Sequence, residues 1–529
     1  MSLISFHVAR TLLSARPQRV KGLRGQECPR HTSMRSKTEL MGPALVSVLL
    51  TAALLSGCAV GPNYKRPAAQ VPDTWKGEGP WQSAVPKDSI PKGTWWQVYH
   101  DAELDRLEQE LLQANQSLVA ARDRLWQARS LARVATAAYF PSLSANPSGQ
   151  RQRVSGNRDL EGANPALVKP DTENTFTVPF SVNYEVDLFG SVRRGLEAAN
   201  ASLQGTAADL ENTRLVLTAE LAADYFNLRE LDREADVVRE SVDIQKKGLD
   251  LVNYQHEGGI ASGLAVAQQA ALLDSTATQL QLVLQQRAQH EHAIAVLTGQ
   301  PASNFSLNKA PFNVTPPAIP TGLPSEILQR RPDVATSERQ MAYQNAQVGL
   351  AKAAFYPHIT LGGSGGWQSR DIATLVNAPS AIWALGGSIL QPIFTGGQNR
   401  ANLAASQAAY DQSVANYREA VLEAFQQVED GLSGLSFLDQ AAKAQQLAVD
   451  DSRRALDIAN NRYVGGVTTY LDVITAQSTL LTNERLAAQL LGQQMVTSVF
   501  LVKALGGGWD ASQIQNEQVR PELWQALQQ

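Results

Sequence analysis

The stretch TFTVPFSVNYEVDLFG, residues 175–190, alternates between apolar and polar side chains along its whole length. The apolar parity contains Phe176, Val178, Phe180, Val182, Tyr184, Val186 and Leu188. The polar parity contains Thr175, Thr177, Ser181, Asn183, Glu185 and Asp187. A period of two predicts a β-strand with one apolar face and one polar face. Pro179 is expected to require a bulge or an edge position, because proline cannot donate a ladder hydrogen bond.

Long helices are expected on the C-terminal side of this strand. Residues 192–256 contain no proline and are rich in Ala, Gln and Leu. Leucines recur there at heptad-like spacing, at Leu203, Leu210, Leu217, Leu221, Leu228 and Leu231. A helix of this length spans on the order of 90 Å at a rise of 1.5 Å per residue. That is far longer than an ordinary globular helix.

Several short motifs occur twice in the same order, just over two hundred residues apart. AAYFPSL at 137–143 returns as AAFYPHI at 353–359, and LTG at 297–299 returns as LGG at 505–507. Phe189-Gly190 is matched by Phe394-Thr395-Gly396, and the glycine pair of the segment 258–260 by that of 465–467. Ordered recurrence at one spacing predicts a tandem duplication. Each copy should contain a helix, two strands, a long helix, a Gly-Gly turn and a returning helix.

The expected organisation follows from these two copies and from the Pro-rich segments around them. It consists of an N-terminal extension and signal peptide at 1–57, a tether at 58–100, repeat 1 at 101–308, a Pro-rich linker at 309–324, repeat 2 at 325–508 and a tail at 509–529. Repeat 1 has helices at 101–139, 192–256 and 264–298 and strands near 142–153 and 174–189. Repeat 2 has helices at 325–355, 398–463 and 470–505 and strands near 358–370 and 381–394. The tail is expected to pack against the linkers or to be disordered.

The apolar run ALVSVLLTAALL at 44–55 is too short to cross a membrane as a helix. Arg35 and Lys37 precede it and Leu-Ser-Gly-Cys follows it, which is the order of a bacterial lipoprotein signal peptide. Cys58 is therefore the expected lipidation site, carrying palmitate as the first residue of the mature chain. Residues 1–33 do not fit a signal peptide, so translation is expected to start at Met34 or Met41.

Composition and motif spacing argue against other classes of function. The net charge of −4 gives no basic field for nucleic acid, and a mean hydropathy of −0.22 argues against a bundle of transmembrane helices. His290 and His292 lie on different faces of a helix, so the HEH sequence is not a metal site. GGSGG at 362–366 lies in a strand context and does not match a phosphate loop. We expect no enzyme activity, no cofactor and no metal.

Two strands per copy give four strands per chain, whereas single-chain membrane barrels begin at about eight. A four-stranded sheet with an apolar outer face would leave open edges in lipid. Membrane-spanning strands would therefore have to be pooled, as eight from a dimer or twelve from a trimer. Aromatic residues near the strand ends fit interfacial girdles, namely Phe176, Tyr184, Phe189, Trp367, Trp383 and Phe394. A soluble sandwich whose apolar faces meet in a core is the alternative.

Nearly the whole mature chain resembles the outer-membrane factors of tripartite efflux pumps, the TolC/OprM-like channels, and specifically their NodT-type lipoprotein branch. The segments that carry this resemblance are CAVGPNYKRP at 58–67, TWWQVYHDAELDRLEQELL at 94–112, NQSLVAAR at 115–122, AAYFPSL, YEVDLFG at 184–190, LQRRPDV at 328–334, AAFYPHITL at 353–361, PIFTGG at 392–397 and RYVGGVTTYLDVITAQ at 462–477. The resemblance implies an α+β membrane protein, a homotrimer whose twelve-stranded outer-membrane β-barrel continues into a long periplasmic α-helical barrel. It also implies a lipid-anchored location in a Gram-negative outer membrane.

The resemblance implies that the channel is gated at its periplasmic end, just after the second Gly-Gly turn. Tyr463 and Asp472 match the family's gate positions, and Thr475 stands where some members carry a second aspartate. Thr468 replaces a basic partner and Ala265 an acid of the first copy, so the latch should depend less on charge and more on hydrogen bonding by Tyr463. The alternative for Asp472 is an ordinary aspartate at a helix N-terminus, stabilised by the helix dipole.

The two helical turns are the expected contacts for a periplasmic membrane-fusion adaptor. They comprise Gly258, Gly259, Ile260, Ala261 and Ser262 in the first copy and Gly465, Gly466, Val467, Thr468 and Thr469 in the second. Glycines that simply end a helix are the alternative.

The implied function is an exit duct that exports small molecules such as drugs, with an inner-membrane pump of RND, ABC or MFS type as a partner. A type I protein secretion channel and a non-conducting lipid-anchored coiled-coil scaffold are the alternatives. A passive porin is disfavoured because porins fold about sixteen strands from one chain.

Overall fold

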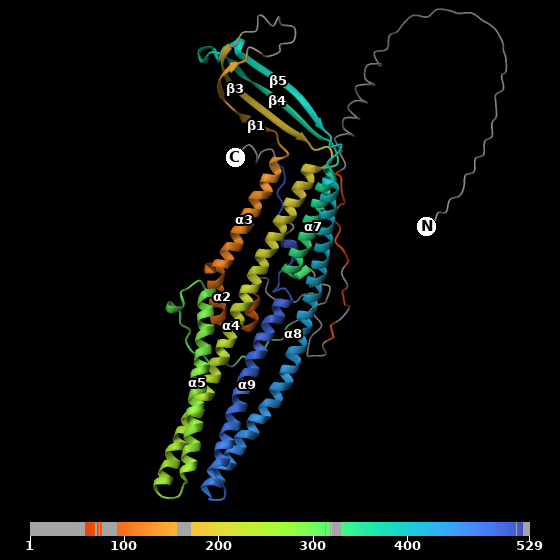
Figure 1. Cartoon of the computed structure of the whole chain (residues 1–529). Coiled ribbons are helices and arrows are strands. Elements are labelled where there is room, and N and C mark those ends of the chain that lie inside the picture. Colours follow the sequence, from red (N-terminus) through yellow and green to blue (C-terminus); the bar gives the residue numbers. More distant parts are fainter. Residues whose placement is uncertain are drawn as a thin grey trace, which may run out of the picture. The chain divides into compact units, whose positions relative to one another are not determined.

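The computed structural model describes residues 59–68, 71–72, 75–76, 93–155, 171–312, 314–317, 319, 329–514 and 516–521. All described residues belong to one unit of the chain, Gly57–Gln529 (Figure 1). The predicted signal peptide, the translation start and Cys58 lie outside the described residues.

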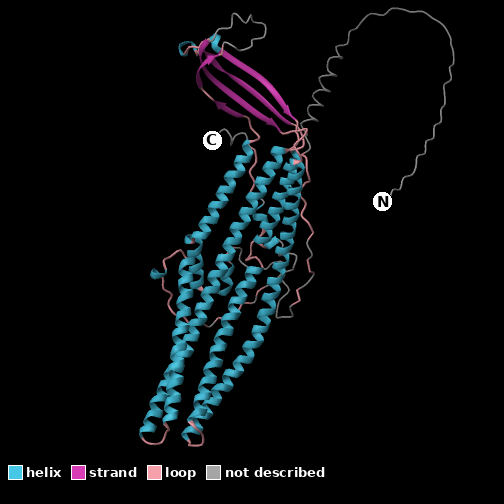
Figure 2. Cartoon of the chain, in the orientation of Figure 1, coloured by secondary structure: helices cyan, strands magenta, loops and turns pink. Residues whose placement is uncertain are grey.

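Seven α-helices are described in this unit (Figure 2). They are α2 (Ala102–Ala114), α3 (Gln116–Ala137), α4 (Ser191–Glu257), α5 (Gly263–Leu297), α7 (Pro332–Ala353), α8 (Gln398–Val464) and α9 (Tyr470–Ala504). The expected boundaries of the four longest helices are correct to within one residue. Corresponding helices have equal lengths: α3 and α7 have 22 residues each, α4 and α8 have 67, and α5 and α9 have 35.

The single helix expected at 101–139 is in fact two helices, because the chain breaks at Asn115. Its side-chain oxygen accepts the N–H of Leu118 at 3.0 Å and so caps α3. Its amide nitrogen donates to the carbonyl of Leu297, at the end of α5, at 2.9 Å. The break therefore ties the start of α3 to the end of a distant helix. In repeat 2, helix α7 begins at Pro332, and residues 325–328 of the expected helix lie outside the described part of the chain.

The strands form one antiparallel sheet in the order β1-β3-β4-β5, with β2 also paired to β3. Their bounds are β1 Ser142–Ala145, β2 Ser148–Val154, β3 Asp171–Val186, β4 His358–Ser369 and β5 Ala381–Leu390. The strand expected at 142–153 is thus two collinear pieces on the same side of β3. Pro147 lies between them, and its missing N–H explains the interruption.

Pro179 occupies an interior strand in unbroken register with β4, so the expected bulge or edge position is wrong. Its carbonyl accepts the N–H of Asn146 at 3.3 Å, on the side of β1 and β2. Because the N–H and C=O of an antiparallel residue point the same way, the missing donor faces the gap between those two pieces. On the other side Pro179 is paired with Gly366, where an added Cβ would lie 2.0 Å from the carbonyl oxygen of Val178.

The helices pack side by side in a single row, and different helices form this row near the sheet and far from it. Near the sheet, α4 packs against α3 and α7, and α7 packs against α8. Farther from the sheet, α4 packs against α5 and α9, and α9 packs against α8 (Figure 1). One side of the row therefore ends in α3 and α5, and the other side ends in α8.

The main apolar core lies where α2, α4, α8 and α9 meet, and it includes the buried Trp95 and Trp96. The described part of the tail packs on helices. Trp509 and Ile514 are buried against α3, α4 and α7, and Arg129 pairs with Glu517 at 2.6 Å. Among the described residues, no helix has both the length and the apolar character needed to cross a membrane.

Candidate functional site

The two helical turns at the far ends of α4 and α8 have the same geometry. Gly259 and Gly466 adopt φ angles of +75° and +71°, which only glycine takes up without strain. The N–H of Ile260 donates to the carbonyl of Gln255 at 2.8 Å, and the N–H of Val467 makes the equivalent bond at 2.9 Å. Each turn therefore closes by the same helix-ending hydrogen bond.

Each turn also presents one branched apolar side chain to solvent. Ile260 is 80% exposed and Val467 is 67% exposed. Ser262 caps α5 by accepting the N–H of Ala265 at 3.3 Å, whereas Thr469 makes no such bond at the start of α9. The glycines therefore have a structural role, because they allow the chain to turn. The side chains of Ile260 and Val467 beside them remain accessible to solvent.

Tyr463, near the end of α8, joins that helix to α4. Its hydroxyl donates a hydrogen bond to Oε1 of Gln255. Its ring meets the ring of Tyr470 edge-on, with centroids 5.0 Å apart and planes inclined at 62°. The predicted hydrogen bond by Tyr463 is therefore present, and its acceptor lies on the long helix of the first repeat.

Tyr470, at the start of α9, is a central residue here that the sequence did not single out. It is buried with Val252, Leu456 and Val473. A Cβ added to Gly248 of α4 would lie 2.6 Å from the Tyr470 hydroxyl, so a glycine is required for this contact. Burial, and next the neighbouring Tyr463, raises the pKa of Tyr470 to about 12, so the phenol is neutral. The only signal in the sequence was a glycine inside an otherwise helical run.

Asp472 and Thr475 do not join Tyr463 in one cluster. Both are exposed on α9, in a groove between α8 and α9. Thr468 donates a hydrogen bond to the Asp472 carboxylate, and the Thr475 hydroxyl donates back to the Leu471 carbonyl at 2.9 Å. Asp472 also lies in the first turn of α9, where a helix dipole stabilises a negative charge. Thr468, where the resemblance suggests a basic residue in other members, is thus the partner of Asp472.

A buried polar network joins α4, α5 and α9 midway along the helices. Glu234 accepts from Arg485 at 2.7 Å, and Arg485 also donates to Gln279 at 3.0 Å. Glu230 lies beside them, 9% exposed, and burial followed by the Glu234 charge raises its pKa to about 8. A Cβ on Gly492 would come within 2.4 Å of the Glu230 side chain, so α9 approaches α4 closely here.

The strand register assigns side chains to the two faces of the sheet. Val182 pairs with Leu143 and Gly363, and Gly363 pairs with Leu385, so these positions share one face. The expected apolar parity of β3 therefore lies on the same face as the exposed Trp383, Leu385 and Ile389 of β5. A hollow of the sheet is lined in large part by small polar side chains, namely Ser181, Asn183, Thr360, Ser364 and Ser388.

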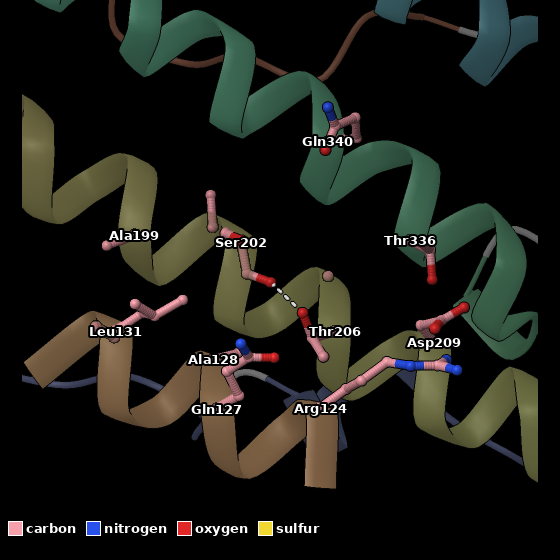
Figure 3. Close-up of a pocket in the computed structure, with 13 residues that line it drawn as sticks. Arg124, Gln127, Ala128, Leu131, Ala199, Ser202, Thr206, Asp209, Thr336 and Gln340 are labelled. Carbon is pink, nitrogen blue, oxygen red and sulfur yellow. Dashed lines mark hydrogen bonds between the residues drawn. The ribbon is translucent and has the colours of Figure 1, made fainter. Parts of the chain in front are cut away.

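A further groove lies between α3, α4 and α7 (Figure 3). Arg124, on α3, extends toward Asp209 on α4, and Thr206 donates to the Ser202 carbonyl at 2.9 Å. The walls mix alanines with amides and hydroxyls. In the described part of the chain, no three His, Cys, Asp or Glu side chains are grouped so as to hold a metal ion. The groove offers hydrogen bonds but no pair of groups arranged for acid–base chemistry.

The sequence model of a family described as outer membrane efflux protein matches residues 107–300 and 323–507 of this chain. The chain belongs to the outer membrane efflux protein family. Its members are outer-membrane channels of efflux systems and not enzymes, so the resemblance seen in the sequence is confirmed. The two matches coincide with the two runs of helices and strands described above.

Curated relatives and solved structures of the family agree with this membership. The chain is 32% identical over 467 residues to the pyoverdine export outer membrane protein OpmQ of Pseudomonas aeruginosa, covering 88% of this chain and 97% of that one. It is 31% identical to the outer membrane protein OprJ of the same organism, over 88% of this chain and 96% of that one. The open-state crystal structure of the Neisseria gonorrhoeae MtrE outer membrane channel aligns with a TM-score of 0.75 at 28% identity, covering 86% of this chain and 99% of that one. The chain thus has the TolC-like α+β fold and is an outer-membrane efflux protein.

Proposed function

We propose that three copies of this chain close into one channel that serves as the exit duct of a tripartite efflux pump. The observation that carries this proposal is the open row of elements within one chain. The sheet ends in β1 and β2 on one side and in β5 on the other. The helix row likewise ends in α3 and α5 on one side and in α8 on the other.

Apolar side chains are exposed along these free edges. On α8 they are Leu422, Phe437, Leu447 and Ile458. Their spacings of 15, 10 and 11 residues place them within about 80° of each other around the helix, at 100° per residue. On α3 and α5 they include Trp126, Leu131, Val134, Leu282 and Val296. Large apolar side chains that recur on one exposed side of a helix fit an interface with another chain.

Because the two edges differ, they can pair only head-to-tail, and a head-to-tail interface closes into a ring when its rotation allows. The collinear β1 and β2 act as one strand, so each chain contributes four strands to such a ring. Two copies would give eight strands and three would give twelve, and the family resemblance favours twelve. The apolar face of β3 and β5 then faces lipid, and the hydroxyl-rich hollow faces the lumen.

The N-terminal segment supports a lipid anchor at Cys58. The N–H of Val60 donates to the Phe189 carbonyl at 3.0 Å, where β3 passes into α4. The Arg194 side chain holds the carbonyls of Val60 and Gly61, both at 3.2 Å. The chain that follows Cys58 thus begins beside the membrane end of the helices, within reach of the bilayer.

We place the gate at the ends of α4, α8 and α9. The Tyr463–Gln255 hydrogen bond and the buried Tyr470 hold α8 and α9 against α4, and Asp472 adds an anionic ring in the trimer. The exposed turns around Ile260 and Val467 dock the periplasmic adaptor, which links the channel to an inner-membrane pump of RND, ABC or MFS type. The equal helix lengths of the two halves support the proposed tandem duplication.

Small molecules are the favoured cargo. The named relatives include a pyoverdine exporter and a solvent efflux pump protein, and both names describe small compounds. A type I protein secretion channel and a non-conducting scaffold are the competing functions. Single-channel recording of the purified protein in planar bilayers distinguishes a channel from the non-conducting scaffold, because a scaffold conducts no ions.

The trimer is tested by mass measurement of the purified protein in detergent. Leu447→Glu, on the free edge of α8, is expected to dissociate the trimer, because it buries a charge in an apolar contact. Asp451→Glu, an exposed position on the same helix, is the matched control and should leave the trimer intact. A monomeric wild-type protein that still conducts would contradict the proposal.

A further inference from the structure

Two arginines of β2 lie on the apolar face of the sheet. Gly149 is paired with Phe176, Arg151 with Asn174 and Arg153 with Thr172. Directly paired residues on neighbouring strands point to the same face. A Cβ on Gly149 would lie 3.3 Å from the Phe176 ring, as this face assignment requires. Arg151 and Arg153 therefore continue the face that carries Phe176, Val178 and Val182.

These arginines lie just past the end of the apolar band. The apolar parity of β3 runs from Val186 to Phe176, ten residues, or about 34 Å along the strand. With the usual strand tilt this corresponds to a height of about 25 Å, the height of the lipid-facing band of membrane barrels. The next two positions of this face on β3 are polar. Arg151 and Arg153 are their neighbours, at the level where headgroups begin.

This end of the sheet is the one remote from the helices. The chain enters β1 from α3 and passes from β3 into α4 at the other end of these strands (Figure 1). With the helices in the periplasm, the Arg151 end of β2 therefore reaches the outer leaflet.

Within the described part of the chain, the positive charge on this face has no acidic partner. Both arginines are exposed, and neither forms an ion pair with any residue that the structure describes. On the opposite face at the same level, Arg370 is paired with Glu173 at 3.1 Å. Among the residues that the structure describes, the lumen-facing arginine thus has a carboxylate partner, whereas the two lipid-facing ones have none.

We propose that Arg151 and Arg153 bind the phosphate groups of the phosphorylated glycolipid, lipid A, in the outer leaflet of the outer membrane. Arginine is suited to this task, because its planar fork binds phosphate oxygens in pairs and remains charged. Arg151 and Arg153 are two residues apart on one strand, so their Cα atoms are separated by about 7 Å. At this spacing the two guanidinium groups can bind one phosphate together or two adjacent phosphates. Asn174, directly opposite Arg151 on β3, adds an amide donor on the same face.

This proposal rests on the lipid-facing assignment made under the proposed function. It adds a lipid contact that lies away from the gate and the adaptor turns. Its consequence is that the channel carries bound glycolipid at each copy of β2, which fixes the depth of the sheet in the asymmetric bilayer. Zwitterionic headgroups offer no comparable net negative charge, and the phospholipids of the inner leaflet meet the opposite end of the strands.

The test uses the purified full-length protein and diphosphorylated lipid A, with bound lipid counted by native mass spectrometry. Arg151→Gln/Arg153→Gln is expected to bind lipid A at least tenfold more weakly than the wild type. Arg370→Gln, the control at the same level on the opposite face, should bind it normally. Arg151→Lys/Arg153→Lys should recover part of the affinity, because the charges remain while the fork is lost.

Two further arms identify the source of the phosphate. Dephosphorylated lipid A should bind the wild type at least tenfold more weakly, and phosphatidylglycerol should not displace the diphosphorylated form. Equal binding of lipid A by the wild type and the double Gln variant would overturn the proposal. So would efficient displacement by phosphatidylglycerol, which would indicate a general anionic-lipid contact.

Ion selectivity in planar bilayers separates this proposal from the proposed function. If the two arginines faced the lumen, Arg151→Gln/Arg153→Gln would shift the reversal potential in a salt gradient, and the lipid site would be refuted. An unchanged reversal potential with lost lipid A binding supports the site. A wild-type protein with no conductance at all refutes the channel itself.

Discussion

The Tyr463 hydroxyl of α8 hydrogen-bonds the Gln255 side chain of α4, two residues that are 208 positions apart in the sequence. This bond connects the end of the second long helix to the end of the first. Both helices terminate in the same Gly-Gly turn within a few residues of it. The contact therefore lies at the helix ends where we propose the gate.

Tyr463→Phe should raise the open probability of the channel. The ring and its packing on Tyr470 remain, and only the bond to Gln255 is lost, which weakens the closed state by about 0.5–1.5 kcal/mol. Single-channel recording measures the effect. Tyr254→Phe is the matched control, because Tyr254 is an exposed tyrosine near the end of α4. Identical open probabilities for Tyr463→Phe and the wild type would show that the Tyr463–Gln255 hydrogen bond does not contribute to gating.

Gly248→Ala should destabilise the contact between α4 and α9. The added methyl would lie 2.6 Å from the Tyr470 hydroxyl and 3.2 Å from the Gln269 amide, so one of these groups must move. Overpacking of this kind typically costs about 1–3 kcal/mol. Thermal unfolding of single and double variants provides the measurement.

Tyr470→Phe should rescue part of the cost of Gly248→Ala, because it removes the oxygen nearest to the new methyl. The two substitutions should therefore be non-additive in a double-mutant cycle. Strict additivity would show that the alanine acts through something other than Tyr470, for example through Gln269.

Stability should fall as the pH rises from about 5 to 8 because of Glu230. Burial in the α4–α9 contact raises the pKa of this carboxyl from 4.5 to about 8. Between these values the folded protein holds a proton that the unfolded chain has released, so the contribution is complete below pH 4.5 and is lost as the pH approaches 8.

Glu230→Gln is neutral at every pH and should remove this decline. Relative to the wild type, its melting temperature should rise progressively between pH 5 and pH 9. Glu240→Gln, at an exposed position on the same helix, serves as the control and should follow the wild type. A melting-temperature difference for Glu230→Gln that stays constant across this range would argue against the buried proton.

Glu108→Leu should stabilise the packing of α2 on α4. Glu108 is fully buried, and neither carboxyl oxygen has a hydrogen-bond partner among the described residues. Burial, and next the charge of Asp105, raises its pKa well above the ordinary value. Replacing this group by an apolar side chain of similar size should gain about 1–3 kcal/mol.

Glu110→Leu is the comparison for that substitution, because Glu110 pairs with Arg106 on the partly exposed side of the same helix. Glu110→Leu should not raise the stability of the protein. Thermal unfolding, through the melting temperature, or chemical unfolding, through the free energy of unfolding, can measure this. A loss of stability in Glu108→Leu would instead indicate that the buried carboxyl is required by a neighbour.

The sequence by itself determined the secondary structure and the family. Alternation in 175–190 predicted β3, and long proline-free stretches closed by glycine pairs predicted α4 and α8 with their return helices. These features are local, because a strand face has a period of two and a helix needs only its own backbone bonds and a terminating glycine. The gate role of Tyr463, by contrast, was implied by the family resemblance of the segment 462–477, and it stays a prediction.

Only the tertiary structure decided which side chains meet. The break at Asn115 depends on the Leu297 carbonyl, and the position of Pro179 depends on the gap opposite it and on Gly366. Tyr470 and Glu230 gain their roles from Gly248 and Gly492, each on another helix more than two hundred residues away. These contacts are set by the register between helices and between strands. No local pattern encodes that register, since it is fixed by close packing between segments distant in the chain.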